Sequence, residues 1–286
     1  MSSRITISIV TYNSAWVIAG CLDSIPPDCP VMICDNASKD DTVAVARAAR
    51  PDAVITVARK NFGFGRGHNV NLRRVQTEFA LVFNPDARLL PGALDALLNA
   101  ADTHKDAAII GGQHYQQNGE TRIICTGNDT YCLPGIAHRT TWPEVPSRVD
   151  YIIGAMMLFR MDVLRAVGLF DRKIFMYHED LEICARVRKA GYYVWFEPLA
   201  KVIHLCGKSC AECVFIARLK QFYHSQCKLI VFRKYHASKI KFYGFALKEF
   251  LQQLRRFFKS LIKFSWIGVN KHAAGIWGVL KGLKPN

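Results

Sequence analysis

Close to its N-terminus the chain reads Ile5-Thr6-Ile7-Ser8-Ile9-Val10-Thr11-Tyr12-Asn13, a largely apolar run rich in β-branched residues that ends in polar ones. Such a run is typical of a strand that is buried on both faces. Similar runs follow at 31–34, 54–57 and 79–83, and a helical pattern separates each run from the next. Strands that alternate with single helices predict a mainly parallel sheet with helices on both faces. The sequence therefore indicates an α/β, Rossmann-like fold.

The composition limits the class of protein. The chain has 286 residues, of which 50% are hydrophobic, so it can build one large domain or two small ones around a real core. No apolar stretch reaches the roughly 18 residues that a membrane span needs. The N-terminus runs directly into the first strand pattern and shows no signal-peptide segment with a cleavage site. We therefore expect a cytoplasmic protein.

The chain has ten cysteines, and several fall in apolar patterns where a free thiol is a small core residue. A tighter group follows the last predicted strand and consists of His204, Cys206, Cys210 and Cys213. Thiolates and imidazole at short spacing suit zinc. Because the spacing fits no common zinc finger, we expect unligated thiols, with structural zinc as the alternative.

The net charge of +15 is concentrated in one part of the chain. From residue 218 to the end there are fifteen Lys and Arg residues and one acid, Glu249. Between 247 and 263, apolar residues recur every three or four positions with cations among them, which predicts a basic amphipathic helix. We expect a body of residues 1–217 and a basic helical tail of residues 218–286. The tail suits an anionic membrane, and the alternative is packing on the body with a solvated basic face.

The second half of the chain has a looser pattern. Residues 116–147 are polar and contain Gly, Pro and Asn, which predicts an irregular excursion. A helix is expected from Glu179 to Ala190, because Gly191 suits the position after its last turn. The other expected elements are strands at 107–112, 151–159, 193–196 and 202–203, and helices from 13 or 14, from 38 or 40 to about 49, from 67 to 76, from 91 and from 161.

Polar clusters follow four strands of the first half: Thr11-Tyr12-Asn13, Asp35-Asn36, the glycine-rich stretch 61–67, and Asn84-Pro85-Asp86. The carboxyl ends of parallel strands share one edge of the sheet, and ligands bind beyond that edge. The four clusters therefore predict one binding site. The alternative for each cluster taken alone is an ordinary turn or connector.

The residue types in these clusters indicate what each part of the site could bind. Asp35 can accept hydrogen bonds from a base or a ribose, and the small residues of 61–67 can approach a phosphate closely. Asp86 can hold Mg²⁺, which often uses only one or two protein carboxylates together with substrate phosphates. His204 follows a strand and is either a further metal ligand or an ordinary half-buried histidine.

A second acidic cluster, His178-Glu179-Asp180, opens a helix. The apolar residues before it can raise the pKa of a carboxyl group toward the range of a general base. The alternative is that these acids only cap the helix. Glu182 lies more than half a turn from Asp180 and is expected to face solvent.

Together these motifs resemble the inverting family 2 glycosyltransferases with a GT-A fold, and most of all their bacterial rhamnosyltransferase-like branch. The resemblance runs from about Ile5 to Gly207 and covers six motifs in order. They are Val10-Thr11-Tyr12-Asn13-Ser14, Cys34-Asp35-Asn36-Ala37-Ser38, Asn61-Phe62-Gly63-Phe64-Gly65 with Asn69, Asn84-Pro85-Asp86, Phe175-Met176-Tyr177-His178-Glu179-Asp180, and Val202-Ile203-His204.

The resemblance implies roles for matching positions. Asp86 resembles the metal-binding aspartate, with Asn84 in place of the first acid, and His204 resembles the histidine that completes the metal site. Asp180 resembles the catalytic base, and Glu179 is its neighbour. His178 stands where this branch usually has an aromatic residue.

On the nucleotide side, Asp35 resembles the residue that holds the base, and Thr11 begins the loop that lines its pocket. The residues expected to bind the nucleotide sugar are Thr11, Tyr12, Asn13, Asp35, Asn36, Asn61, Gly63, Asn69 and Asn84. The body then divides into a nucleotide-sugar half, residues 1–104, and an acceptor half, residues 105–217.

The implied activity is inverting, metal-dependent sugar transfer with Mg²⁺ or Mn²⁺. By analogy the expected donor is dTDP-rhamnose first and a UDP-sugar second. The expected acceptor is a saccharide or lipid-linked saccharide in surface polysaccharide synthesis. The tail would hold the enzyme on the inner face of the cell membrane. A nucleic-acid-binding protein is the main alternative for so basic a chain, but no nucleic-acid-binding motif accompanies the charge, so no nucleic-acid partner is expected. An inactive GT-A scaffold is a further alternative.

Overall fold

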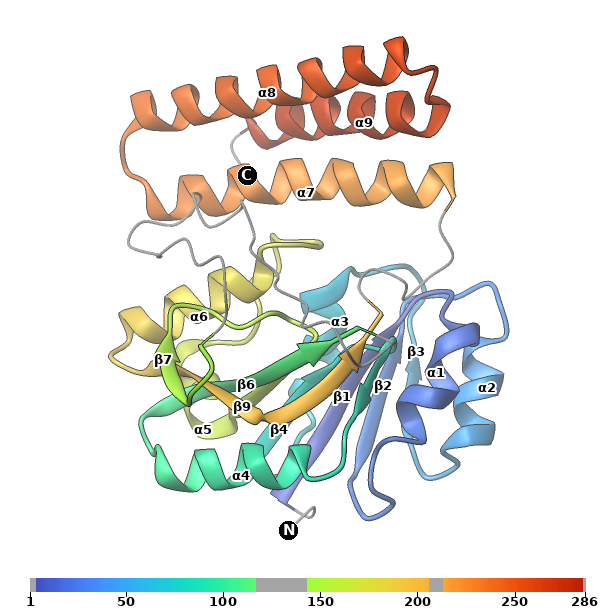
Figure 1. The fold of residues 1–286 in the computed structure, drawn as a ribbon, viewed down its shortest axis with the longest axis vertical. Coiled ribbons are helices and arrows are strands. Elements are labelled where there is room, and N and C mark those ends of the chain that lie inside the picture. The colour runs from blue at the N-terminus through green and yellow to red at the C-terminus, as the bar shows by residue number, and fades with distance from the viewer. Residues whose placement is uncertain (1–3, 117–142, 206–212, 285–286) are drawn as a thin grey trace.

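A computed structural model of the chain describes residues 4–116, 143–205 and 213–284 (Figure 1). Cys206 and Cys210 of the cysteine group lie outside the described residues, as does most of the predicted excursion at 116–147. The strands are β1 (Ile5–Thr11), β2 (Val31–Asp35), β3 (Val54–Val57), β4 (Phe79–Phe83), β5 (Ala87–Leu89), β6 (Ala107–Tyr115), β7 (Ser147–Val149), β8 (Met156–Arg160) and β9 (Tyr193–His204). The helices are α1 (Ala15–Leu22), α2 (Thr42–Ala49), α3 (Phe64–Leu72), α4 (Ala93–Thr103), α5 (Met161–Val167), α6 (Glu179–Lys189), α7 (Val214–Tyr235), α8 (Lys239–Ile262) and α9 (Trp266–Gly282).

The described strands form one mixed sheet in the order β3-β2-β1-β4-β8-β6-β9-β5, and β7 pairs with β9. Strands β3, β2, β1 and β4 are parallel, as the sequence predicts. Strand β8 is antiparallel to both β4 and β6, whereas β6 and β9 are parallel to each other. The antiparallel β8 therefore separates the four parallel strands β3, β2, β1 and β4 from β6, β9, β5 and β7.

Helices cover both faces of this sheet, and strand β4 shows the reason. Its alternate residues Phe79, Leu81 and Phe83 are buried in one core with α1, α2 and α4. The intervening Ala80 and Val82 belong to the opposite core with α3, α5 and α6. Because neighbouring side chains of a strand point to opposite faces, an uninterrupted apolar strand needs a cover on each side. The predicted α/β class is confirmed.

Several predicted element boundaries are wrong. Helix α3 starts at Phe64, so Gly65 and Gly67 lie inside a helix rather than in a connector. Strand β8 is shorter than predicted and begins at Met156. The two predicted strands at 193–196 and 202–203 are one strand, β9, which shifts its register against β6. Strand β5 was not predicted, because three residues give too short a pattern.

The starts of α1 and α2 lie close to where they are predicted, but one predicted cap is absent. Helix α1 follows Ser14, but the Ser14 side chain makes no capping hydrogen bond. Instead the backbone N–H of Ala15 donates to Asp40 Oδ2 over 3.1 Å. Asp40 Oδ1 accepts from the backbone N–H of Thr42, where α2 starts. One aspartate from the loop before α2 therefore serves the N-termini of two helices. The predicted helix end is confirmed, since Gly191 follows α6 with φ +92°.

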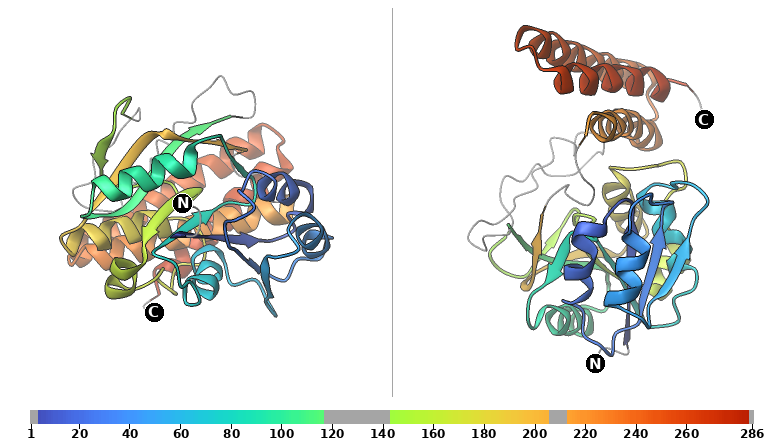
Figure 2. Two further views of the ribbon diagram at one scale, coloured as in Figure 1. Left: turned by 90° about the horizontal axis from the view of Figure 1, so that it is seen from below. Right: turned by 90° about the vertical axis from the view of Figure 1, so that its right-hand side faces the viewer.

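The C-terminal helices α7, α8 and α9 form a separate layer beyond the carboxyl ends of β1, β2 and β4 (Figure 1). In the side view the α8–α9 pair lies farthest from the sheet, with α7 between (Figure 2). The predicted border at 217/218 falls inside α7, which starts at Val214. Across the described ranges, none of the helices combines the length and apolar character that a bilayer crossing requires.

Candidate functional site

A cavity of about 300 Å³ opens at the carboxyl ends of β1, β2 and β4, between the sheet, α6 and α7. This size lies at the lower end of the range usual for small-molecule sites. The cavity wall includes nine of the predicted site residues: Thr11, Tyr12, Asn36, Asn61, Gly63, Asn84, Glu179, Asp180 and His204. The convergence predicted from four strand ends is therefore present in the structure.

Asp35 lies behind this wall rather than on it. Its side chain is buried, and Oδ1 accepts from the Thr11 hydroxyl over 2.8 Å. Oδ2 accepts from the backbone N–H of Ser38 over 2.9 Å. The carboxylate thus fixes Thr11, which does line the cavity, and ties β1 to the loop after β2. A direct contact between Asp35 and a nucleotide stays a prediction.

The glycine-rich stretch is held against the segment that precedes α6. Gly63 has φ +81°, and a Cβ at this position would come within 1.9 Å of the Phe175 carbonyl oxygen. The same oxygen accepts from the backbone N–H of Phe64. Asn36 donates to the Gly63 carbonyl over 3.0 Å, and Asn61 Oδ1 accepts from the Gly63 N–H over 2.8 Å. Glycine is required here because both the left-handed conformation and the close approach exclude a side chain.

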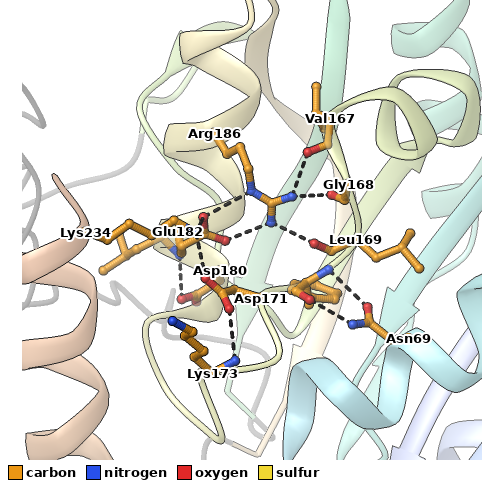
Figure 3. Close-up of polar contacts among 12 residues, drawn as sticks. Asn69, Val167, Gly168, Leu169, Asp171, Lys173, Asp180, Glu182, Arg186 and Lys234 are labelled. Carbon is orange, nitrogen blue, oxygen red and sulfur yellow. Dashed lines mark hydrogen bonds and ion pairs between the residues drawn. The ribbon is translucent and has the colours of Figure 1, made fainter. Parts of the chain in front are cut away.

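Besides Asp35, two predicted nucleotide-binding residues are not part of the cavity wall. Asn13 has φ +52°, and its Oδ1 accepts from the Lys39 N–H over 2.7 Å. Asn69 forms a two-way amide pair with the Phe170 backbone, with bonds of 2.8 and 3.0 Å (Figure 3). Both side chains fasten loops around the cavity.

The two predicted metal ligands are brought together by the pairing of β5 with β9, in which Ala87 lies opposite His204. Asp86 Oδ1 lies 3.5 Å from His204 Nε2, and Asn84 Nδ2 lies 3.2 Å from the same nitrogen. Asp86 is buried behind His204, which lines the cavity. No group of three or more His, Cys, Asp and Glu side chains within the described residues could hold a metal unaided. The donor set of one carboxylate and one imidazole nevertheless fits a cation whose coordination is completed by phosphate oxygens and water.

The acids at the start of α6 project from a strained turn. Tyr177 and His178 have φ +71° and +67°, an uncommon conformation for residues with side chains. Asp180 lines the cavity, with Oδ1 accepting from the Leu181 N–H over 2.8 Å and Oδ2 from the Gly154 N–H over 3.1 Å. Burial, reinforced by the neighbouring Asp180, raises the pKa of Glu179 to about 8. Both causes favour the protonated form of Glu179.

The expectation that Glu182 faces solvent is wrong, because its side chain is fully buried. It accepts two hydrogen bonds from Arg186, at 3.1 and 2.8 Å, and one from Lys234 of α7, at 2.8 Å (Figure 3). Lys234 also contacts Asp171 at 2.6 Å. Burial alone would lower the pKa of Lys234, but the hydrogen bonds to Asp171 and Glu182 outweigh it and raise the pKa above its ordinary value. We call these four residues the α6–α7 ion cluster.

Sequence reasoning also missed three cavity residues on α7: Ile216, Leu219 and Lys220. They lie three and four positions apart, so they share one face of the helix. This spacing was available in the sequence. It was overlooked because Leu219 and Lys220 fall in the stretch interpreted as a tail.

The chain was compared with known proteins. Residues 3–223 match the family described as "Glycosyltransferase like family 2". The chain is 27% identical over 201 residues to an N-acetylglucosaminyl-diphospho-decaprenol L-rhamnosyltransferase of Mycobacterium tuberculosis, with 61% of this chain and 66% of that protein covered. It is 23% identical over 210 residues to the O-antigen chain rhamnosyltransferase RfbN of Salmonella typhimurium, with 70% and 66% covered. The chain thus spans just under two thirds of the length of these curated relatives.

Solved structures show a related fold. The mannosyltransferase PcManGT of Pyrobaculum calidifontis, in complex with GDP-Man and Mn²⁺, aligns with a TM-score of 0.57 at 16% identity, covering 98% of this chain and 87% of that one. The S. aureus TarS 1-349 structure aligns with a TM-score of 0.56 at 17% identity, covering 95% and 90%. The solved structures support the fold, and the family match covers the motifs around the cavity. The chain belongs to glycosyltransferase family 2, with the GT-A fold and rhamnosyltransferase-like motifs that its sequence predicts.

Proposed function

We propose that the protein is an inverting glycosyltransferase that moves a sugar from a nucleotide-diphosphate donor to a saccharide or lipid-linked saccharide acceptor. The observation that carries this proposal is the placement of Asp180 on the wall of a cavity that Thr11, Asn36 and Gly63 also line. The relatives named as rhamnosyltransferases make dTDP-rhamnose the first candidate donor and a UDP-sugar the second.

Asp180 is the proposed general base. Two backbone N–H groups fix its carboxylate on the cavity wall, where an acceptor hydroxyl could approach it. As that hydroxyl attacks the anomeric carbon, its proton moves to Asp180 while the bond to the diphosphate breaks on the opposite face. A single displacement of this kind inverts the configuration. The raised pKa of Glu179 favours its neutral form beside Asp180, which limits the negative charge that faces the acceptor.

Asp86 and His204 are the residues that would hold Mg²⁺ or Mn²⁺. When bound, such a cation neutralises charge on the departing diphosphate. The Asn84 side-chain nitrogen lies 3.2 Å from His204 Nε2, and a cation held by that ring nitrogen would replace this contact. The support for a metal here is the donor set of this pair, together with the Mn²⁺ in the PcManGT complex.

The test is transfer and binding by the full chain with Asp180→Asn. Loss of the base should lower turnover about 10²- to 10⁴-fold, whereas calorimetric affinity for the donor nucleotide should stay within about twofold. Asp95→Asn, an exposed acid on α4, is the matched control and should behave as the wild type. Near-normal turnover in Asp180→Asn would reject the assignment.

We further propose that α8 and α9 rest on an anionic membrane, on the inner face of the cell membrane. One stripe of α8 exposes large apolar side chains at spacings of three and four residues: Ile240, Tyr243, Leu247, Leu251, Phe258 and Ile262. Exposed cations flank the stripe, among them Lys248 and Lys259. Each cation near an anionic leaflet contributes roughly 1 kcal/mol. Buried apolar side chains add to this attraction.

Liposome flotation of the full chain tests this second proposal. The double variant Leu251→Asp, Phe258→Asp should no longer float with anionic vesicles, while transfer to a soluble acceptor is retained. Both side chains are more than half exposed, so the fold should tolerate the change. Equal flotation of variant and wild type would defeat the proposal.

A further inference from the structure

Lys220 occupies an unusual place on the cavity wall. It is half-buried on α7, on the helix face that also carries Ile216 and Leu219. Among the described residues, Lys220 is the only Lys or Arg that lines the cavity, and the carboxyl groups on the wall belong to Glu179 and Asp180. The wall otherwise consists mostly of apolar and uncharged polar side chains. A fixed positive charge in such surroundings acts strongly on an anionic ligand.

We propose that Lys220 binds the diphosphate group of a ligand in this cavity. This inference rests on the proposed function, because that function supplies the diphosphate. Lysine is a compact cation with three donors and commonly binds phosphate as a point charge. The Asn84-Pro85-Asp86 motif has Asn84 where a second acid could stand, so Asp86 is the one carboxylate that this motif supplies. A cation from α7 adds stabilisation for the negative charge that develops when the bond to the sugar breaks.

The structure fixes the position of Lys220 relative to both the glycine-rich stretch and the base. Tyr223 lies three residues after Lys220 and stacks on Phe175, with ring centroids 3.9 Å apart. Phe175 is the residue whose carbonyl oxygen holds the turn at Gly63 and Phe64.

Farther along α7, the ion cluster joins Lys234 to Glu182, two residues after Asp180. Tyr235 adds a hydrogen bond to the same carboxylate. The α7 helix is therefore anchored at two points, and its cavity face cannot rotate away without breaking one of them.

Two sources can supply the diphosphate: the nucleotide donor, or an acceptor linked to a lipid through diphosphate. Binding measured by calorimetry with Mn²⁺ separates them. The donor probes are UDP and dTDP against UMP and dTMP, and the acceptor probes are a short prenyl diphosphate against its monophosphate. The proteins are the full chain, Lys220→Ala, Lys220→Arg, and Arg218→Ala as the control, because Arg218 is an exposed cation on the same helix that does not line the cavity.

Lys220→Ala should weaken binding of one class of diphosphate by about 10- to 100-fold, the equivalent of one charge-assisted hydrogen bond. Affinity for the corresponding monophosphate should change far less. Lys220→Arg should retain most of the affinity, and Arg218→Ala all of it. Loss confined to the nucleotide probes assigns Lys220 to the donor, and loss confined to the prenyl probes assigns it to the acceptor.

The inference is overturned if folded Lys220→Ala binds every diphosphate as tightly as the wild type does. The proposed function would still stand in that case. A wild-type chain that binds none of the nucleoside diphosphates would instead overturn the proposed function. Circular dichroism melting of each variant distinguishes lost binding from lost folding.

Discussion

Replacing Glu182 with alanine should destabilise the protein far more than the loss of an ordinary surface acid. The Glu182 side chain is fully buried and accepts from Arg186, Lys234 and Tyr235. Breaking a buried ion pair by removing one partner typically costs about 3–5 kcal/mol, because a charge is left behind.

Here the cost should lie at the lower end of that range, at about 3 kcal/mol. Lys234 keeps its contact with Asp171, and its side chain is 38% exposed, so water can solvate part of its charge. Arg186 keeps hydrogen bonds to the carbonyl oxygens of residues 167–169. Both cations therefore retain part of their environment.

Urea unfolding of the full chain, followed by circular dichroism, measures this loss. The control is Asp102→Asn, which removes an exposed pair with Arg4 and should cost less than about 1 kcal/mol. If Glu182→Ala and Asp102→Asn shift the unfolding midpoint equally, the cluster does not anchor α7 on α6. A double-mutant cycle of Glu182→Ala and Lys234→Met would then show no coupling energy between these two residues.

Three further outcomes are expected. The pKa of Glu179 rises from 4.5 to about 8 on folding. The free energy of unfolding should therefore fall as pH rises across that interval, by up to about 1.4 kcal/mol per pH unit. Thermal melts from pH 5 to 8 should show this slope in the wild type and lose it in Glu179→Gln. Gly63→Ala should lower the melting temperature and weaken nucleotide binding, since its methyl group meets the Phe175 carbonyl oxygen at 1.9 Å; a variant matching the wild type in both would contradict this reasoning. Asp86→Asn should weaken Mn²⁺ binding in the presence of UDP at least tenfold, as read by calorimetry, and unchanged Mn²⁺ affinity would remove Asp86 from the metal site.

The sequence predicts the parallel half of the sheet well, because each of its strands is a largely apolar run that is followed by polar residues. It also places Asn36, Gly63 and Asp180 on one cavity, since strand ends and helix starts fix where such residues point. Contacts between distant segments are harder to predict. Nothing near Glu182 in the chain indicates that Lys234, more than fifty residues later, covers it.

The same reason explains why the surroundings of Asp35 and Lys220 could not be predicted. Asp35 resembles a ligand-binding acid, but its carboxylate is already engaged by Thr11 and Ser38 once the loops close. Lys220 was assigned to a basic tail because net charge was counted along the chain. Such a count does not show which way a side chain points. Only the packing of α7 beside the sheet shows that this cation faces inward.

The family match ends at residue 223, in the middle of helix α7, which continues to Tyr235. A chain trimmed at that border for a domain swap would keep Lys220 but lose Lys234, which pairs with the buried Glu182, and Tyr235, which donates a hydrogen bond to it. The shortened protein would then carry a buried negative charge with fewer counter-charges, on a helix severed partway through. A transferable unit therefore has to include all of α7, and α8 with it, because Lys228 of α7 pairs with the buried Glu249 of α8.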